Sequence, residues 1–335
     1  MSKLLKDQMK LRQTAPNTYS ISWHSDWVIG LSFSGASITA ILHYVASQYV
    51  SANIAAQPDV QKLHIEFLRG CVPAESSITV TPLKLGAMVS TLQLELQQKD
   101  KVKVMALATM TDLTKPAGPT LPPSDWFLQP PPSPLPDFEA IEAQRPDPNW
   151  LRFRLDDEVF PLTRHLLNMY PAVGFPYNGL VDGWIRITSD EDRIDAMFLG
   201  AMCDLVPSLS DTGLRNGGLY DAHTNHGIVT RWAASQNPPG GGPPAVLAVK
   251  RETALKSPIV HQTITLDAEF KRRLPAEGLR WVYTRAGTRM TRGGRMDLDI
   301  VLCDENMELV CVGQQLLVVV DSKRRFGTQK PDSNL

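Results

Sequence analysis

The sequence of 335 residues lacks the features that most directly assign a compartment. It has no run of about 20 apolar residues, the length that a membrane-spanning helix needs. It opens on the polar stretch MSKLLKDQMKLRQT, where a secretory signal would be apolar, and its formal net charge is only −1. We therefore expect a cytoplasmic protein that does not associate with membranes or nucleic acid.

Reactive motifs are also scarce. There is no GxSxG sequence, which argues against a hydrolase with a serine nucleophile on an α/β fold. The four cysteines form no CxxC pair and lie in apolar runs, which predicts buried free thiols in a reducing compartment: Cys71, Cys203, Cys303 and Cys311. His223 and His226 lack a nearby third ligand and stand in a segment that we predict to be a Gly-rich loop. We expect no metal and no cofactor.

Apolar spacing in the first half predicts one long helix followed by strands. Residues 34–50 carry apolar side chains at helical intervals, and Ser34 is a suitable N-cap. Four segments with alternating or β-branched residues follow: 61–70, 76–86, 88–98 and 101–112. A helix that precedes a run of long antiparallel strands predicts a sheet that wraps around the helix.

The second half repeats this order after a Pro-rich segment, residues 113–149. Proline at this density disfavours both helix and sheet and favours an extended connection, and its aromatic residues indicate that it packs along the protein. A strand at 179–188 and a helix at 190–209 then precede strands at 260–273, 278–290, 295–305 and 307–321. Loop-rich material at about 210–258 interrupts this second copy.

A recurring phrase supports the duplication. IEFLRGCVPAES at 65–76 and AEFKRRLPAEG at 268–278 share Glu-Phe, an Arg and Pro-Ala-Glu, with one residue of slippage. In both halves this phrase is the first long strand after the helix. We therefore predict an N-terminal unit at 18–112, a linker at 113–149 and a C-terminal unit at 150–325.

With these phrases, GLVDGWIRI, the helix that ends in Asp before Pro, and LVCVGQQLLVV, residues 20–325 resemble the acyl-CoA thioesterase II-like superfamily. The chain departs from that family at SFSGAS, where a Gly-Gly pair usually opens the first helix, and in the Gly-rich insertion. The resemblance implies an α+β double hotdog, in which two helix-wrapped antiparallel sheets are fused into one surface. Because the fused pair already supplies the contact that single hotdogs gain by dimerising, we leave homo-oligomerisation open.

The resemblance also implies an activity and a site. Family enzymes hydrolyse acyl thioesters with a water held by Asp, Thr or Ser, and Gln, and the matching positions are Asp204, Thr263 and Gln315. Thr265 competes with Thr263 for the hydroxyl role. The substrate would be an acyl-CoA or an acyl chain on a carrier protein. If the reading holds, the three side chains should converge around one water, within about 3 Å.

Several alternatives stay open. His24 with Asp26 is the only His–Asp pair near the first helix, and such a pair would suit a dehydratase, or a cyclase or product-releasing enzyme of secondary metabolism. A chain without turnover would be an acyl-binding module. The arginines between 280 and 295 suit either coenzyme A phosphates or a solvated sheet edge. The terminal Ser333-Asn334-Leu335 only loosely resembles a peroxisomal signal, since the basic middle residue is missing.

Overall fold

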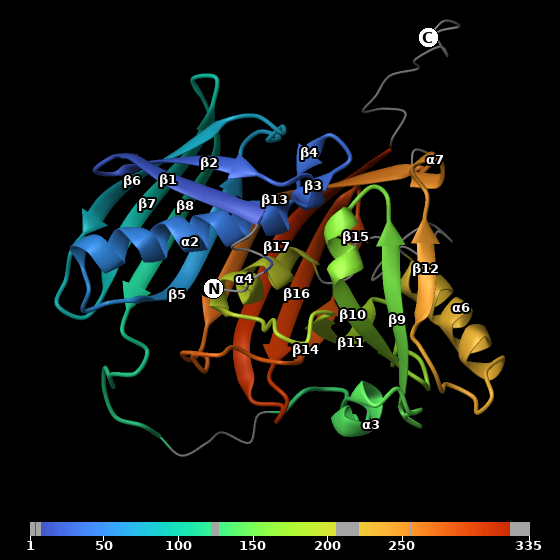
Figure 1. Cartoon of the computed structure of the whole chain (residues 1–335). Helices are drawn as coiled ribbons and strands as arrows, with labels where there is room; N and C mark the ends of the chain where they lie inside the picture. The colour runs from blue at the N-terminus through green and yellow to red at the C-terminus, as the bar shows by residue number, and fades with distance from the viewer. Residues whose placement is uncertain (1–3, 5–7, 122–126, 206–220, 255, 322–335) are drawn as a thin grey trace, which may run out of the picture.

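A computed structural model of the chain describes residues 4, 8–121, 127–205, 221–254 and 256–321. One continuous sheet dominates it (Figure 1), in the strand order β1-β2-β6-β7-β8-β5-β13-β17-β16-β14-β11-β10-β9-β12, with β15 beside β16. Neighbouring strands run antiparallel except β12, which is parallel to β9. No helix among the described residues is long and apolar enough to cross a membrane.

The N-terminal half wraps its strands around helix α2, Gly35–Asn53. Its strands are β1 Met9–Ala15, β2 Thr18–Trp23, β5 Asp59–Phe67, β6 Ser76–Lys84, β7 Ser90–Gln98 and β8 Lys101–Thr111. The turn η1 (Ser25–Trp27) and the small hairpin of β3 (Val28–Ile29) and β4 (Ser32–Phe33) lead into α2. The expected N-cap is present, because the Ser34 side chain accepts a hydrogen bond from Ser37 N.

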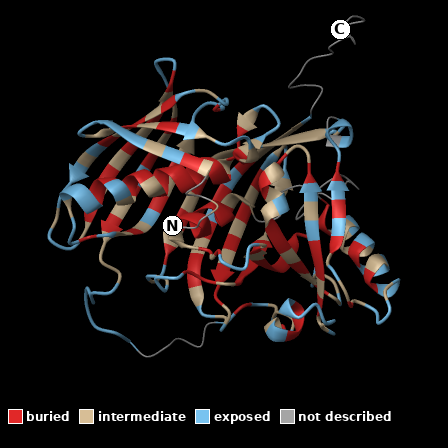
Figure 2. Ribbon diagram, viewed as in Figure 1, coloured by how far each residue is buried: buried red, intermediate tan, exposed pale blue. Residues whose placement is uncertain are grey.

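Alternation along the strands explains why the sheet faces α2. In β7 the leucines at 92, 94 and 96 are fully buried, while the residues between them are half-buried. Helix α2 buries most of its own side chains against this face (Figure 2), including Ile38, Ile41 and Leu42. Burying a Leu or Ile side chain contributes about 1.5–3 kcal/mol, so this layer carries much of the fold's stability.

The C-terminal half repeats the arrangement around helix α4, Ala196–Leu205, which packs against α2. Its strands are β9 Trp150–Asp157, β10 Leu166–Pro171, β11 Leu180–Ile187, β12 Ala245–Val249, β13 Ile259–Phe270, β14 Val282–Gly287, β15 Thr291–Arg292, β16 Arg295–Cys303 and β17 Leu309–Asp321. Its smaller elements are η2 Pro161–His165, α6 Ala222–Ala234 and α7 Arg251–Ala254.

The two recurring phrases begin in the last residues of β5 and β13 and continue into the segments that follow, and these two strands join the halves. They pair antiparallel from Glu66 opposite Thr265 to Lys62 opposite Glu269. The central pair is His64 opposite Asp267, with His64 Nδ1 at 3.1 Å from Asp267 Oδ1. The expected fusion of two helix-wrapped sheets into one surface is therefore present.

The Pro-rich linker packs on the outer face of the C-terminal sheet, as its aromatic residues predict. It includes the short helix α3, Phe138–Glu142. The Phe138 ring lies 5.0 Å from that of Trp184 and 5.5 Å from that of Trp281. The buried Arg285 guanidinium bonds both oxygens of Asp182 and also donates to the Pro130 carbonyl. The linker is thus a covering layer of this half.

The structure also corrects the predicted organisation. The sheet begins at Met9, ahead of residue 18, and β9, β10 and β12 have no counterpart in the predicted strands. Helix α4 starts at Ala196 rather than at residue 190, because the Asp195 side chain caps it by accepting from Phe198 N. The predicted helix residues 206–209 lie outside the described residues. The insertion contains helix α6, capped by Asp221.

Candidate active site

Asp204 lies in the last turn of α4 and points at the first turn of α2. Its Oδ2 accepts a hydrogen bond of 2.8 Å from Ala36 N. A Cβ on Gly35 would lie only 2.7 Å from both carboxylate oxygens, so glycine leaves the room that the carboxylate occupies. A helix N-terminus carries partial positive charge, which favours a carboxylate here. The site therefore combines a side chain of one half with the backbone of the other.

Thr263 reaches the same place because of a β-bulge. The pairing of β13 with β17 shifts between Thr263 and Thr265, so that Thr263 lies opposite the buried Leu317 and Thr265 opposite the exposed Leu316. Thr263 consequently faces inward and Thr265 outward. Thr263 Oγ1 lies 3.1 Å from Asp204 Oδ1, which is hydrogen-bond distance.

Gln315 completes the group from β17. Its side chain is buried, and its Oε1 lies 3.2 Å from Thr263 Oγ1. Its Nε2 donates to the Cys203 carbonyl at the end of α4, which fixes the orientation of the amide. The neighbouring Gln314 faces outward, where its amide bonds Asp299. The Thr263 hydroxyl has a single hydrogen, so it donates either to Gln315 Oε1 or to Asp204 Oδ1 at one time, whereas the amide nitrogen of Gln315 is paired with the Cys203 carbonyl.

The environment of Asp204 raises the pKa of its carboxyl group. Burial raises the pKa of the carboxyl group above its ordinary value, and the hydrogen bonds from Thr263 and from Ala36 N lower it in part. A carboxylate whose pKa is raised is a stronger base than an ordinary aspartate. The group keeps two hydrogen bonds that stabilise the charged form, so it can still serve as a base.

The structure thus brings together Asp204, Thr263 and Gln315 from three elements that are far apart in the sequence. Sequence reasoning did not find three backbone features of the site: Ala36 N, the space at Gly35 and the Cys203 carbonyl. SFSGAS was the only signal for the first two, and it stood out as a departure from a family pattern. The third is a main-chain group that no sequence pattern reports.

The equivalent positions of the N-terminal half are different. His43 stands nine residues after the cap Ser34, as Asp204 does after the cap Asp195. Val60 precedes Phe67 as Thr263 precedes Phe270, and Ala108 lies opposite Leu63 as Gln315 lies opposite Leu266. Val60 and Ala108 are apolar and buried, and neither His43 ring nitrogen has a hydrogen-bond partner among the described residues. The N-terminal half therefore has no connected polar group at the positions equivalent to Asp204, Thr263 and Gln315.

The side chains of His24 and Asp26 form hydrogen bonds within the protein. His24 Nδ1 accepts from Asp26 N at the start of η1. Asp26 Oδ2 bonds Gln8 Nε2 at 3.0 Å and His165 Nε2 at 2.9 Å. These contacts tie the N-terminal segment to η2, and they commit Asp26 to partners other than a substrate.

The two histidines of the insertion lie in helix α6, so the prediction of a loop there is wrong. Asp221 is a favourable N-cap for this helix, since its side chain accepts from His223 N and Thr224 N. His226 Nε2 bonds the Pro171 carbonyl at 2.8 Å, and the His223 ring packs edge-on against Phe175. Among the residues that the structure describes, no group of three or more His, Cys, Asp or Glu side chains could hold a metal ion.

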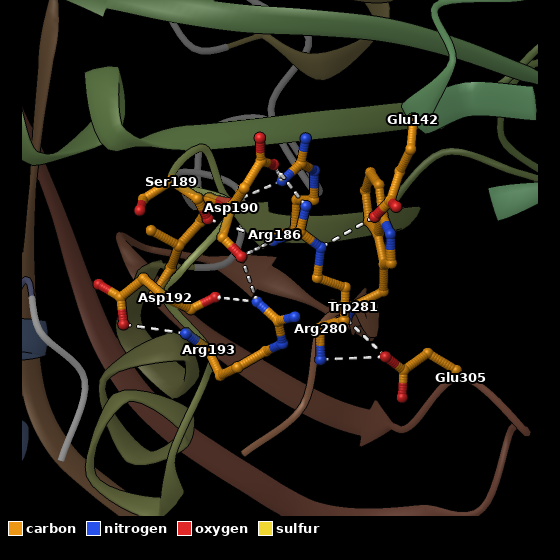
Figure 3. A network of polar contacts seen from close by, with 10 residues as sticks. Glu142, Arg186, Ser189, Asp190, Asp192, Arg193, Arg280, Trp281 and Glu305 are labelled. Carbon is orange, nitrogen blue, oxygen red and sulfur yellow. Dashed lines mark hydrogen bonds and ion pairs between the residues drawn. The ribbon is translucent and has the colours of Figure 1, made fainter. Parts of the chain in front are cut away.

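The arginines between 280 and 295 are largely paired within the protein. Arg280 bonds Glu142 of α3 and Asp190 of the loop before α4 (Figure 3), so it links the linker to that loop. Arg285 is buried against Asp182, and Arg289 bonds Asp297 and Asp299. These contacts favour a structural role over binding of coenzyme A phosphates.

An open cavity of about 890 Å³ lies next to the start of α2. Its wall includes Trp23 and Phe33, whose rings pack 4.1 Å apart, and Phe33 directly precedes the cap Ser34. Its charged lining residues are Lys10, Arg12, Glu75, Glu158 and Arg251. Glu158 forms an ion pair with Lys250 at 2.7 Å, so the other charged side chains of the lining are mostly cationic.

Comparisons with known proteins identify a related sequence and similar folds. The thioesterase-like protein TwmA of Talaromyces wortmannii is 23% identical over 351 residues, which cover 99% of this chain and 96% of that protein. The acyl-CoA thioesterase II TesB2 of Mycobacterium marinum has a TM-score of 0.57 at 17% identity, over 98% of this chain and 100% of that one. A hot dog fold protein of Alicyclobacillus acidocaldarius scores 0.62 at 13% identity, over 96% and 99%.

The fold is therefore a double hotdog of the α+β class. Residues 23–111 match the acyl-CoA thioesterase N-terminal domain, and residues 139–319 match the acyl-CoA thioesterase C-terminal domain. The chain belongs to the acyl-CoA thioesterase family.

Proposed function

We propose that the protein hydrolyses an acyl thioester with a water held by Asp204, Thr263 and Gln315. The observation that carries this proposal is their convergence. Thr263 Oγ1 of β13 lies 3.1 Å from Asp204 Oδ1 of α4 and 3.2 Å from Gln315 Oε1 of β17, beside the apolar core that both halves share. Buried polar groups cost free energy unless paired, so such a cluster in an apolar layer suggests a functional requirement.

The proposed reaction needs no covalent intermediate. Asp204 takes a proton from the water while the water oxygen attacks the thioester carbonyl carbon. The carbon–sulfur bond then breaks as the tetrahedral species collapses. The proton then passes to the departing thiolate, which regenerates the carboxylate. Thr263 and Gln315 orient the water and the carboxylate, so their contribution is positioning rather than proton transfer.

The cavity beside α2 supports a substrate with a long polar carrier group. Phe33 lines the cavity and is followed by the first turn of α2, where Ala36 N contacts Asp204, so a ligand in the cavity could present its thioester at the start of α2. Lys10, Arg12 and Arg251 would favour an anionic carrier such as a phosphopantetheine arm. This fits either coenzyme A or a carrier protein.

The test follows release of free thiol from a panel of acyl-CoA and acyl-N-acetylcysteamine thioesters. Asp204→Asn should lower kcat by about 100-fold or more while the melting temperature stays close to that of the wild type. Thr265→Val and Gln314→Ala are matched controls, since these side chains face the opposite side of the sheet, and both should keep the activity.

Other results would select another function. Full activity of Asp204→Asn would remove Asp204 from the mechanism and contradict the proposal. Ligand binding by the wild type without thiol release would indicate an acyl-binding module. Hydration of enoyl thioesters would indicate a dehydratase, for which His24 and Asp26 are the residues to replace.

A further inference from the structure

One histidine near the candidate site is not used by the proposed mechanism. His261 lies two residues before Thr263 in β13, on a stretch where the pairing with β17 is regular: His261 is opposite Val319 and Thr263 is opposite Leu317. Alternate residues of a strand point to the same face. Val319 packs against the main core and Leu317 is part of it, so His261 and Thr263 both face inward.

One ring nitrogen of this side chain has no partner among the residues that the structure describes. His261 Nε2 is shielded from solvent and makes no hydrogen bond to any of them. Burial lowers the pKa of His261 to about 4, so the ring is neutral at pH 7 and can donate with one nitrogen and accept with the other. A shielded imidazole nitrogen without a partner costs free energy, which a bound ligand could recover.

The His261 side chain as a whole is only partly buried, so a ligand can approach the ring, and a rotation of the ring would bring the shielded Nε2 to it. Strand β5 pairs with β13 only as far as Thr265, whereas β17 accompanies β13 back to Ile259. After Phe67 the chain of β5 turns away, since Leu68 N and Arg69 N both bond the Lys103 carbonyl. His261 therefore lies where the first half of the molecule no longer covers β13.

The spacing along the strand suggests which group of a substrate would reach His261. Two residues of a strand span about 7 Å. In a pantetheine-type thioester, two methylene groups separate the sulfur from the first amide, and the extended arm from thioester carbonyl to that amide spans roughly 6 Å by standard bond lengths. A thioester carbonyl held at Thr263 would place this amide near His261.

We propose that His261 is a substrate-binding residue that hydrogen-bonds the first amide of the pantetheine-type arm. The proposal rests on the proposed hydrolysis, because it takes the position of the thioester from Asp204, Thr263 and Gln315. It assigns the recognised feature to the carrier arm, which coenzyme A and carrier proteins share, rather than to the acyl chain.

The experiment compares two thioesters of the same acid in the full-length protein. The N-acetylcysteamine thioester contains the amide, and the S-pentyl thioester has similar length without it. The wild type should prefer the first by roughly tenfold in kcat/KM, the usual effect of one hydrogen bond. His261→Leu should abolish this preference by slowing only the amide substrate, and His261→Gln should restore part of it.

His64→Leu is the matched control, because His64 is on the outer face of β5 and bonds Asp267 there. It should leave the preference for the amide unchanged. An equal loss on both substrates in His261→Leu would show a structural role and overturn the proposal. If His261→Leu instead slows only substrates whose acyl chain carries an oxygen, the recognised group lies on the acyl side of the thioester. That result would also overturn the proposal.

Calorimetry separates failure of this proposal from failure of the proposed function. The matched thioether analogues of the two substrates are titrated into Asp204→Asn, with and without His261→Leu. Amide-dependent binding without turnover by the wild type would keep the role of His261 and contradict hydrolysis. Turnover without any amide preference would keep the proposed hydrolysis and contradict the role of His261. The absence of both turnover and binding would overturn both proposals.

Discussion

Asp204 has its two carboxylate oxygens committed to different halves of the molecule. Oδ2 accepts from Ala36 N of α2, and Oδ1 lies 3.1 Å from the hydroxyl of Thr263 in β13. The position of the carboxylate therefore depends on the packing of α4 against α2 as well as on its own helix. A small shift of one half relative to the other would break these contacts of Asp204 before it disturbed the apolar packing.

Gly35→Ala should separate activity from stability. The new Cβ would lie 2.7 Å from both carboxylate oxygens of Asp204. The Asp204 side chain is short and can only rotate away, which breaks its hydrogen bond from Ala36 N. We expect thioester hydrolysis to fall by about 10-fold or more, as for a lost positioning contact. Helix propensity favours Ala over Gly by about 1 kcal/mol, so the melting temperature should change little.

Gly227→Ala in α6 is the control for that substitution, since its Cβ would meet only the flexible Arg231 side chain at 3.5 Å. It should keep full activity. Unchanged hydrolysis by Gly35→Ala would show that Asp204 does not need its observed position.

The pH dependence of kcat should report the ionisation of Asp204. The base must be deprotonated, so kcat should fall as pH drops through a pKa that burial has raised above the ordinary value. The hydrogen bond from Thr263 lowers this pKa, and Thr263→Val should therefore move the acid limb to higher pH while also reducing its plateau. A limb that moves to lower pH would contradict this assignment.

His43 is a residue whose removal should stabilise the protein. It is buried, both ring nitrogens lack partners, and its ring packs edge-on against Phe270. His43→Leu removes unpaired polar atoms from the core and should raise the free energy of unfolding by about 1–3 kcal/mol at pH 7, measured by urea denaturation.

The same substitution should flatten the acid dependence of stability. Burial, opposed by Asp195 and Asp59, lowers the pKa of His43 to about 4 in the folded protein, whereas an exposed histidine of the unfolded chain has its ordinary pKa of 6.5. Between these values the unfolded state binds more protons, so stability falls as pH falls. His43→Leu should lose that component, and equal slopes in both proteins would contradict it.

At the scale of elements, periodicity predicts α2 and the long strands because apolar residues at helical or alternating intervals define one buried face. The same reasoning could not choose between Thr263 and Thr265. In an ideal strand both point to the same side, and only the bulge between them turns Thr265 outward. Helix α6 was missed because its capping residue Asp221 precedes few buried apolar positions, Val229 and Ala233 among them.

The linker offers a test of its role as a covering layer. Phe138 packs between Trp184 and Trp281, whereas Phe127 of the same segment is 61% exposed. Phe138→Ala should lower the free energy of unfolding by about 2–3 kcal/mol, somewhat less than for a fully buried Phe. Phe127→Ala should change it by less than about 0.5 kcal/mol. Equal effects of the two substitutions would contradict the packing described.

For the whole molecule, the continuous sheet should hold the halves together without a covalent link. A protease site inserted after Gly118, which is exposed and has open space around it, would separate the two helix-wrapped units. After cleavage we expect both fragments to co-elute in size-exclusion chromatography and to keep most of the hydrolytic activity. Dissociation on cleavage would show that β5 and β13 need the tether to stay paired.

The β5–β13 junction also determines which halves can associate. His64 faces Asp267 at the centre of this pairing, and Lys62 lies 2.9 Å from the same carboxylate. If two C-terminal halves met through the same edge, Asp267 would face a second Asp267. Two N-terminal halves would place His64 opposite His64 and lose the carboxylate that Lys62 contacts. Like charges in direct opposition are unfavourable across strands. The junction thus favours pairing of an N-terminal unit with a C-terminal unit over pairing of two like units.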